Sequence, residues 1–226
     1  MFGCAREWTF KPTLFLYGEQ MNLIKAIAPL LLLVLPACSD VDKDGDDHDG
    51  HHHHDHEVMS TVVLTFTPDT GEALSFSWSE VTGEPVIDDI VLDNETDYSL
   101  SLEFLNEFED PFDDITPEIA DEDDEHQVFI TGSAVTGPAT EDNPDALVEH
   151  SYADEDVNGL PVGLDNDIST LKTGDEGEFM VTLRHMPLQS GNSIKTESSA
   201  ADVASGGFSA IGGDNDVQIT FSLTVQ

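Results

Sequence analysis

The chain has 226 residues, of which 47 are Asp or Glu and seven are Lys or Arg, so its formal net charge is −40 at pH 7. After Cys38 there are 45 acidic residues and four basic ones. A field of this sign excludes nucleic acid as a partner and disfavours anionic lipid surfaces, whereas it attracts divalent cations. Adaptation to a salty habitat, where salt screens the self-repulsion, is the alternative explanation of the acidity.

Residues 1–37 are expected to be a signal peptide region. One cation, Lys25, precedes a mostly apolar run in residues 26–37, which fits the apolar part of a signal peptide and is too short to span a membrane. Residues 1–20 fit no part of such a peptide, so we expect Met21 to be the true start. The run ends in Leu35-Pro36-Ala37-Cys38, which resembles the lipobox of bacterial lipoproteins. That resemblance implies a lipid on Cys38 that anchors the protein to the outer membrane, facing the periplasm or the cell surface.

Residues 38–57 are expected to form a disordered tether, because only Val41 is apolar between Ser39 and Glu57. This stretch is rich in Asp and holds six histidines: His48, His51, His52, His53, His54 and His56. Imidazole binds Zn²⁺, Ni²⁺ and Cu²⁺, and the spacing specifies no single tetrahedral site. The tether is therefore predicted to collect transition metal loosely. A plain solvated spacer is the alternative, and an interrupted run after a lipidation site does not fit a purification tag.

Residues 58–226 alternate apolar and polar residues with period two. Clear examples are residues 73–79, 97–104, 177–185 and 216–225, and further strand candidates are residues 60–66, 85–92, 126–131 and 146–152. Alternating strands separated by Gly, Asn, Asp and Pro indicate half-buried antiparallel sheets. We therefore predict an all-β domain, a single antiparallel β-sandwich of immunoglobulin-like or jelly-roll-like type with seven to nine strands.

One segment within this domain, residues 116–126, has a helical pattern. Thr116 is a candidate cap, Pro117 suits the first helical turn, and the acidic Glu118 lies near the positive end of the helix dipole. Because few of its residues are apolar, we expect a short acidic surface helix or a loop.

Residues 154–165 match the order of oxygen ligands in a calcium loop. Side-chain oxygens would come from Asp154, Asp156 and Asn158, a carbonyl from Leu160, and the closing carboxylate from Asp165. However, Asp rather than Glu closes the loop, and strands rather than helices flank it. The alternative is a hairpin turn that needs no Ca²⁺.

The three histidines of the domain each fall in phase with the apolar face of a predicted strand. They are His126, His150 and His185. If the three imidazoles met at one end of the sandwich, with Glu125 or Glu149 beside them, they would make a zinc site. A strand-end histidine with a purely structural role is the alternative interpretation, since the sequence does not show which strands adjoin.

Three segments, residues 115–130, 152–164 and 177–187, together with the last strand, resemble a family of small Bacteroidetes lipoproteins. Its members often carry the label "type 1 periplasmic binding fold superfamily protein". The label implies an α/β sugar-binding fold, which the period-two alternation contradicts. The resemblance implies a secreted, lipid-anchored β domain and supplies no activity.

Three functional hypotheses follow. The first is a non-enzymatic envelope protein that binds divalent metal, Zn²⁺ or another transition metal, and assists an outer-membrane transporter. The second is a structural or adhesive surface module stabilised by Ca²⁺. The third, a hydrolase that uses paired carboxylates, has the least support, because the chain carries no nucleophile elbow, phosphate loop or zinc-protease motif.

Overall fold

The computed structural model describes residues 58–226. The predictions for the signal region, for Cys38 and for the six tether histidines lie outside the described residues. Among the residues described, no helix has the length and apolar character needed to cross a membrane.

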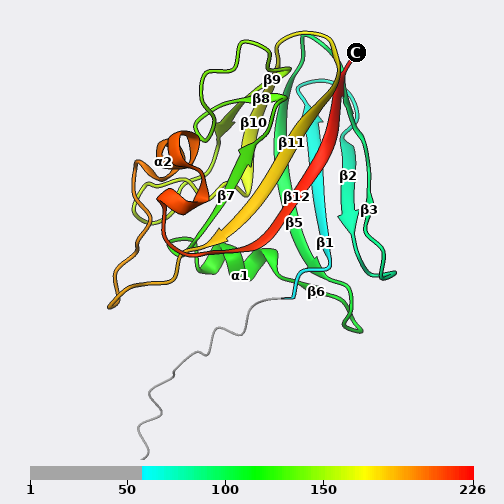
Figure 1. Ribbon diagram of the computed structural model, residues 1–226. Helices are drawn as coiled ribbons and strands as arrows, with labels where there is room; N and C mark the ends of the chain where they lie inside the picture. The colour runs from blue at the N-terminus through cyan, green and yellow to red at the C-terminus, as the bar shows by residue number, and fades with distance from the viewer. Residues whose placement is uncertain (1–57) are drawn as a thin grey trace, which may run out of the picture. The chain divides into compact units, whose positions relative to one another are not determined.

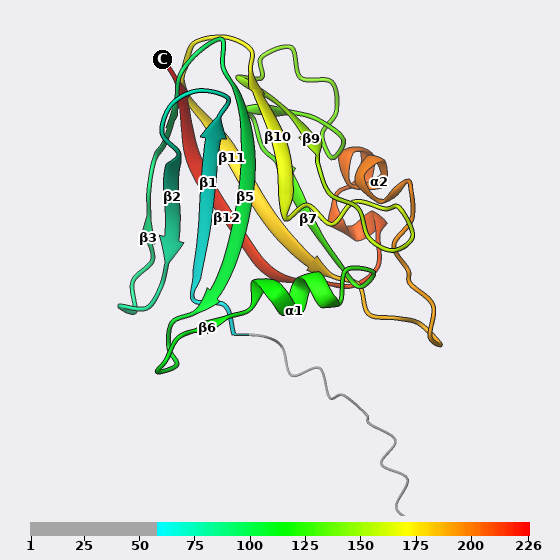
Figure 2. The ribbon, with the colours of Figure 1, turned by 180° about the vertical axis from the view of Figure 1, so that it is seen from behind.

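The described residues form two β-sheets that pack face to face, as Figures 1 and 2 show from opposite sides. In spatial order, the first sheet contains β3 (Val86–Ile87), β2 (Leu74–Ser79), β1 (Thr61–Pro68), β5 (Asp97–Asn106), β10 (Asp165–Thr170), β9 (Val148–Tyr152) and β8 (Val135–Thr136), with β6 (Asp113–Asp114) beside β5. The second sheet contains β4 (Ile90–Leu92), β12 (Asp214–Val225), β11 (Gly174–His185) and β7 (His126–Thr131). The all-β sandwich predicted from the alternation is confirmed.

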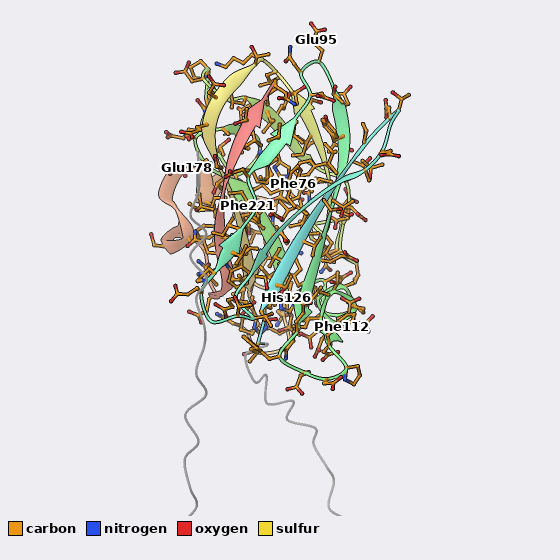
Figure 3. The ribbon with its side chains drawn as sticks, turned by 90° about the vertical axis from the view of Figure 1, so that its right-hand side faces the viewer. Phe76, Glu95, Phe112, His126, Glu178 and Phe221 are labelled. Atoms are coloured by element: carbon orange, nitrogen blue, oxygen red, sulfur yellow. The ribbon has the colours of Figure 1, made fainter. Side chains whose placement is uncertain are left out.

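The alternating strands bury one face each, as the sequence predicts. In β5, Leu100, Leu102 and Phe104 are buried between exposed or half-buried neighbours. Phe66 of the first sheet meets Phe179 of the second edge to face, with ring centroids 6.1 Å apart. Such aromatic pairs fill the space between the sheets, and Phe76 and Phe221 point into the same core in Figure 3.

The structure differs from the predicted sandwich in three respects. Residues 58–226 form twelve strands rather than seven to nine, because β3, β6 and β8 are pairings of two residues each that leave no periodic pattern in the sequence. The single strand expected over residues 85–92 divides into β3 and β4, which belong to different sheets. Two pairings, β12 with β4 and β8 with β9, are parallel, so the sandwich is not purely antiparallel.

Helix α1 (Thr116–Asp121) lies across the end of the sandwich where β1 begins and β11 ends (Figures 1 and 2). The predicted short acidic helix is confirmed, but Thr116 does not cap it. Its hydroxyl instead accepts a hydrogen bond from the Phe104 N–H at 2.9 Å, which fastens the helix to β5. The chain then turns through residues 122–125 into β7.

Strand β7 is buried on both faces, whereas the sequence predicts a half-buried strand. Val128 and Ile130 face the main core, and Phe129 packs on the outer side against Val203 and Phe208. Helix α2 (Ser199–Gly206) and the short 3₁₀ helix η1 (Phe208–Ala210) supply this cover, beside β7 in Figure 1.

Candidate metal centre

Two of the predicted histidines lie directly opposite each other at one end of the second sheet. His126 is the first residue of β7 and His185 is the last residue of β11, and these residues pair in the antiparallel register. Opposed residues on such strands place their side chains on the same face. The two imidazole rings accordingly stack, with centroids 4.7 Å apart and planes inclined by 16°.

The turn between α1 and β7 brings carboxylates to this histidine pair. Ligand atoms of Glu122, His126 and His185 all lie within 4.8 Å of one another, and within residues 58–226 no other group of three or more His, Cys, Asp or Glu side chains converges in this way. We refer to these three residues as the His126–His185 site. Figure 3 shows His126 at the end of the domain opposite to Glu95.

Two further carboxylates lie beside the two rings. Asp216, from β12, has its Oδ2 atom 4.0 Å from Nε2 of His126, and both side chains are almost fully buried. Glu125 has its Oε2 atom 3.8 Å from Nε2 of His185. The same oxygen of Glu125 accepts the N–H of Leu188 at 2.9 Å, which fixes the carboxylate in place. The site therefore combines two imidazoles with an anionic surround.

The hydrogen bonding of His126 fixes which ring nitrogen could bind a metal. Its Nδ1 atom lies 3.2 Å from the carbonyl oxygen of Glu122. A carbonyl oxygen only accepts, so Nδ1 carries a proton, and in the neutral imidazole the lone pair is on Nε2. Histidines that bind metal usually donate their other N–H to a carbonyl or carboxylate in this manner.

The donor set suits a transition metal better than calcium. Zn²⁺ binds His nitrogen and carboxylate oxygen at about 2.0–2.2 Å in tetrahedral geometry, so two ligand atoms on one ion lie about 3.3–3.6 Å apart. The ligand atoms of the site lie within 4.8 Å of one another, so they must move closer when they bind one ion. The two stacked rings must also turn relative to each other, because a metal lies near the plane of each imidazole that binds it. Calcium prefers six to eight oxygen ligands, whereas this site presents two nitrogens.

The third predicted histidine, His150, does not join this group. It lies on β9 in the other sheet, and its Nε2–H donates to Oδ1 of Asn166 at 2.9 Å. Burial lowers the pKa of His150 below its usual value of 6.5, against the opposing effect of that hydrogen bond. These contacts favour the structural interpretation for His150. Glu149, its neighbour, is exposed.

The first acidic residue of the predicted calcium loop has its oxygens occupied by backbone amides. Asp154 accepts the N–H groups of Gly163, Leu164 and Asp165 at 2.6, 2.8 and 3.0 Å. Asp165 begins β10 rather than closing a loop. Burial, followed by the nearby charge of Asp154, raises the pKa of Asp165.

The second acidic residue is satisfied in the same way. Oδ1 of Asp156 accepts the N–H groups of Asn158 and Leu160, both at 2.8 Å, and its Oδ2 lies 3.0 Å from the ammonium of Lys195. Burial alone would raise the pKa of Asp156, but the hydrogen bond from Leu160 and the charge of Lys195 lower it. These contacts favour the hairpin-turn interpretation of residues 154–165.

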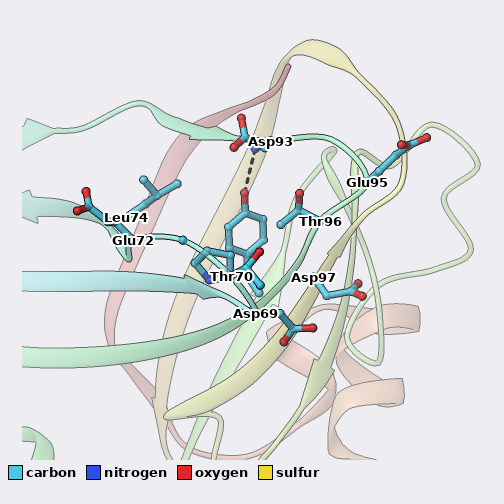
Figure 4. Close-up of a pocket in the computed structure, with 11 residues that line it drawn as sticks. Asp69, Thr70, Glu72, Leu74, Asp93, Glu95, Thr96 and Asp97 are labelled. Atoms are coloured by element: carbon cyan, nitrogen blue, oxygen red, sulfur yellow. Dashed lines mark hydrogen bonds between the residues drawn. The ribbon is translucent and has the colours of Figure 1, made fainter.

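A concavity lies at the end of the sandwich opposite to the His126–His185 site, and Figure 4 shows it in close-up. It has a volume of about 530 Å³, and five acidic residues line it: Asp69, Glu72, Asp93, Glu95 and Asp97. Tyr98 also lines it, and its hydroxyl accepts the Asp93 N–H at 3.0 Å. The acidic side chains there do not converge as those of the His126–His185 site do.

Three residues in or near the site were not predicted from the sequence. Glu122 precedes His126 by four residues across a helix end, Asp216 is a polar residue at the start of an alternating strand, and Lys195 lies in a segment with no periodic pattern. Of the two carboxylates predicted beside the histidines, Glu125 lies next to His185, whereas Glu149 is exposed next to His150 in the other sheet. The one usable signal for Glu122 was its spacing of four residues from His126 at the end of a short helix.

The chain was also compared with models of protein families, with curated proteins and with solved structures. None of the three comparisons found a match. The resemblance to small Bacteroidetes lipoproteins therefore stays a prediction.

Proposed function

We propose that this protein is a lipid-anchored envelope protein whose β-sandwich binds one divalent transition-metal ion, such as Zn²⁺, at the His126–His185 site. The observation that carries the proposal is the convergence of two imidazoles and the Glu122 carboxylate within 4.8 Å. Strand register places the two histidines opposite each other, and the Glu122 carbonyl holds Nδ1 of His126.

The surrounding charge supports binding of a cation. Asp216 and Glu125 lie within 4.0 Å of the two rings, and their carboxylates can stabilise the ion directly or orient the imidazoles. The −40 net charge of the chain also raises the local concentration of divalent cations around the domain.

The histidine-rich tether has a second role in this proposal. Its six imidazoles bind metal loosely and with variable stoichiometry, and they raise the supply of ions near the domain. Anchored through Cys38 in the outer membrane, the protein would act as an accessory to metal uptake beside a transporter. The alternative, an adhesive module stabilised by Ca²⁺, has less support because backbone amides and Lys195 hold the oxygens of Asp154 and Asp156.

A calorimetric zinc titration of the full chain tests the proposal. Replacing all six tether histidines with Asn should leave one zinc equivalent per chain, bound at the domain. Adding His126→Ala and His185→Ala to that variant should abolish this equivalent. His150→Gln is the matched control and should leave zinc binding unchanged, because His150 lies outside the site. Absence of zinc binding to the variant with the tether histidines replaced would contradict the proposal.

A further inference from the structure

A fully buried lysine lies beneath the turn that carries the metal site. The Nζ atom of Lys195 donates to the carbonyl oxygens of Asp123 at 2.8 Å and of His126 at 3.0 Å, and it lies 3.0 Å from Oδ2 of Asp156. The Lys195 and Asp156 side chains are both 0% exposed. An ammonium tolerates such burial only when acceptors replace its water, and these three oxygens match its three N–H groups.

The same lysine connects the site to the loop that resembles a calcium loop. Asp156 holds that loop through the N–H groups of Asn158 and Leu160. In a calcium loop, a metal ion would bind such a carboxylate together with backbone carbonyls. Here the ammonium of Lys195 contacts one carboxylate and two carbonyls, so an internal cation links the loop to the first residue of β7.

The segment that carries Lys195 also binds the turn at other points. The N–H of Met186 donates to the Glu125 carbonyl at 2.6 Å, and the hydroxyl of Ser193 donates to the Asp124 carbonyl at 2.7 Å. Together with Lys195, these groups donate hydrogen bonds to the consecutive carbonyls from Asp123 to His126. The backbone that positions Glu122 and His126 is thus restrained by residues distant in the chain.

We infer that Lys195 is a positioning residue for the His126–His185 site: its ammonium fixes the backbone of the 122–126 turn in the conformation that binds metal. The part of this inference that concerns metal affinity rests on the proposed function. Residues that orient metal ligands without touching the metal contribute about 10-fold to 100-fold in affinity. Because Lys195 acts through the His126 carbonyl, we expect its loss to weaken zinc binding about tenfold.

The test uses the full chain with the tether histidines replaced by Asn, so that only the domain site is measured. Lys195→Met removes the ammonium, and the double variant Lys195→Met with Asp156→Asn also removes the unpaired carboxylate while keeping an acceptor for the loop amides. If the single variant does not fold, the double variant carries the test. Lys172→Met is the matched control, since Lys172 lies 3.7 Å from an Asp145 side chain that is 96% exposed.

The first measurement is amide hydrogen exchange without metal. In the double variant, the amides of Glu125 and Met186, which bond across the turn, should exchange faster, whereas those of β1 and β5 should keep their protection. Unchanged exchange at Glu125 and Met186 would overturn the inference whether or not the domain binds metal.

The second measurement is zinc affinity. The double variant should bind zinc about tenfold more weakly than the parent chain, and Lys172→Met should bind as the parent does. Equal affinity of the double variant and the parent would overturn the inference. If the parent binds no zinc, the proposed function fails, and hydrogen exchange still decides whether Lys195 fixes the turn.

Discussion

Asp154 gives the sharpest test of whether residues 154–165 form a hairpin turn or a calcium loop. Its carboxylate accepts three backbone N–H groups, from Gly163, Leu164 and Asp165. Asp154→Ala leaves these three donors without that partner. At about 1 kcal/mol for each hydrogen bond, the expected loss is about 3 kcal/mol in the free energy of unfolding.

Two substitutions of different severity at Asp154 test whether these hydrogen bonds stabilise the turn. Asp154→Asn keeps one acceptor oxygen, so it should lose about half as much stability as Asp154→Ala. Urea unfolding followed by circular dichroism gives the free energies. Asp142→Ala, at an exposed position, is the control and should change stability by less than about 0.5 kcal/mol. The turn interpretation also predicts that chelating Ca²⁺ leaves the unfolding midpoint of the parent unchanged. A loss below about 0.5 kcal/mol for Asp154→Ala, or a midpoint that falls on chelation, would refute it.

Two more predictions concern other parts of the domain. Burial lowers the pKa of His150 in the folded state, so the unfolded state binds more protons just below pH 6.5, and the free energy of unfolding should decrease as the pH falls through 6.5. Urea titrations at a series of pH values should show that His150→Gln removes this decrease. A pH dependence that His150→Gln leaves unaltered would contradict the assignment of the decrease to His150. Gly213 has a φ of +82°, and a side chain there would overlap the His185 carbonyl, so Gly213→Ala should lower the thermal midpoint more than Gly191→Ala, where φ is +75° and the space is open. Equal thermal midpoints for the two glycine variants would show that the His185 carbonyl does not limit the space for a side chain at position 213.

The sandwich could be predicted from the sequence where alternation was strong. Leu100, Leu102 and Phe104 mark one face of β5 clearly, and the structure buries all three. Strand β10 was missed because Asp, Asn, Ser and Thr supply five of its six residues, so only Ile168 gives an apolar signal. Helix α2 was missed for a related reason, since its small residues show no helical stripe, and tertiary contact with Phe129 stabilises it.

The candidate site could be predicted only in part. The phase of His126 and His185 on their strands was readable from alternation, but the pairing of β7 with β11 depends on topology that no local pattern contains. The same pattern placed His150 with them, although it lies in the other sheet. The contact between the Lys195 ammonium and Asp156 could not be read either, because it joins segments far apart in the chain.

The most direct test of the central claim is to locate zinc in crystals of the full chain by anomalous scattering at the zinc absorption edge. We expect a peak about 2.0–2.2 Å from Nε2 of His126, with a nitrogen of His185 and an oxygen of Glu122 at similar distances. Anomalous peaks found only away from these three residues, at zinc concentrations that saturate the calorimetric titration, would contradict it.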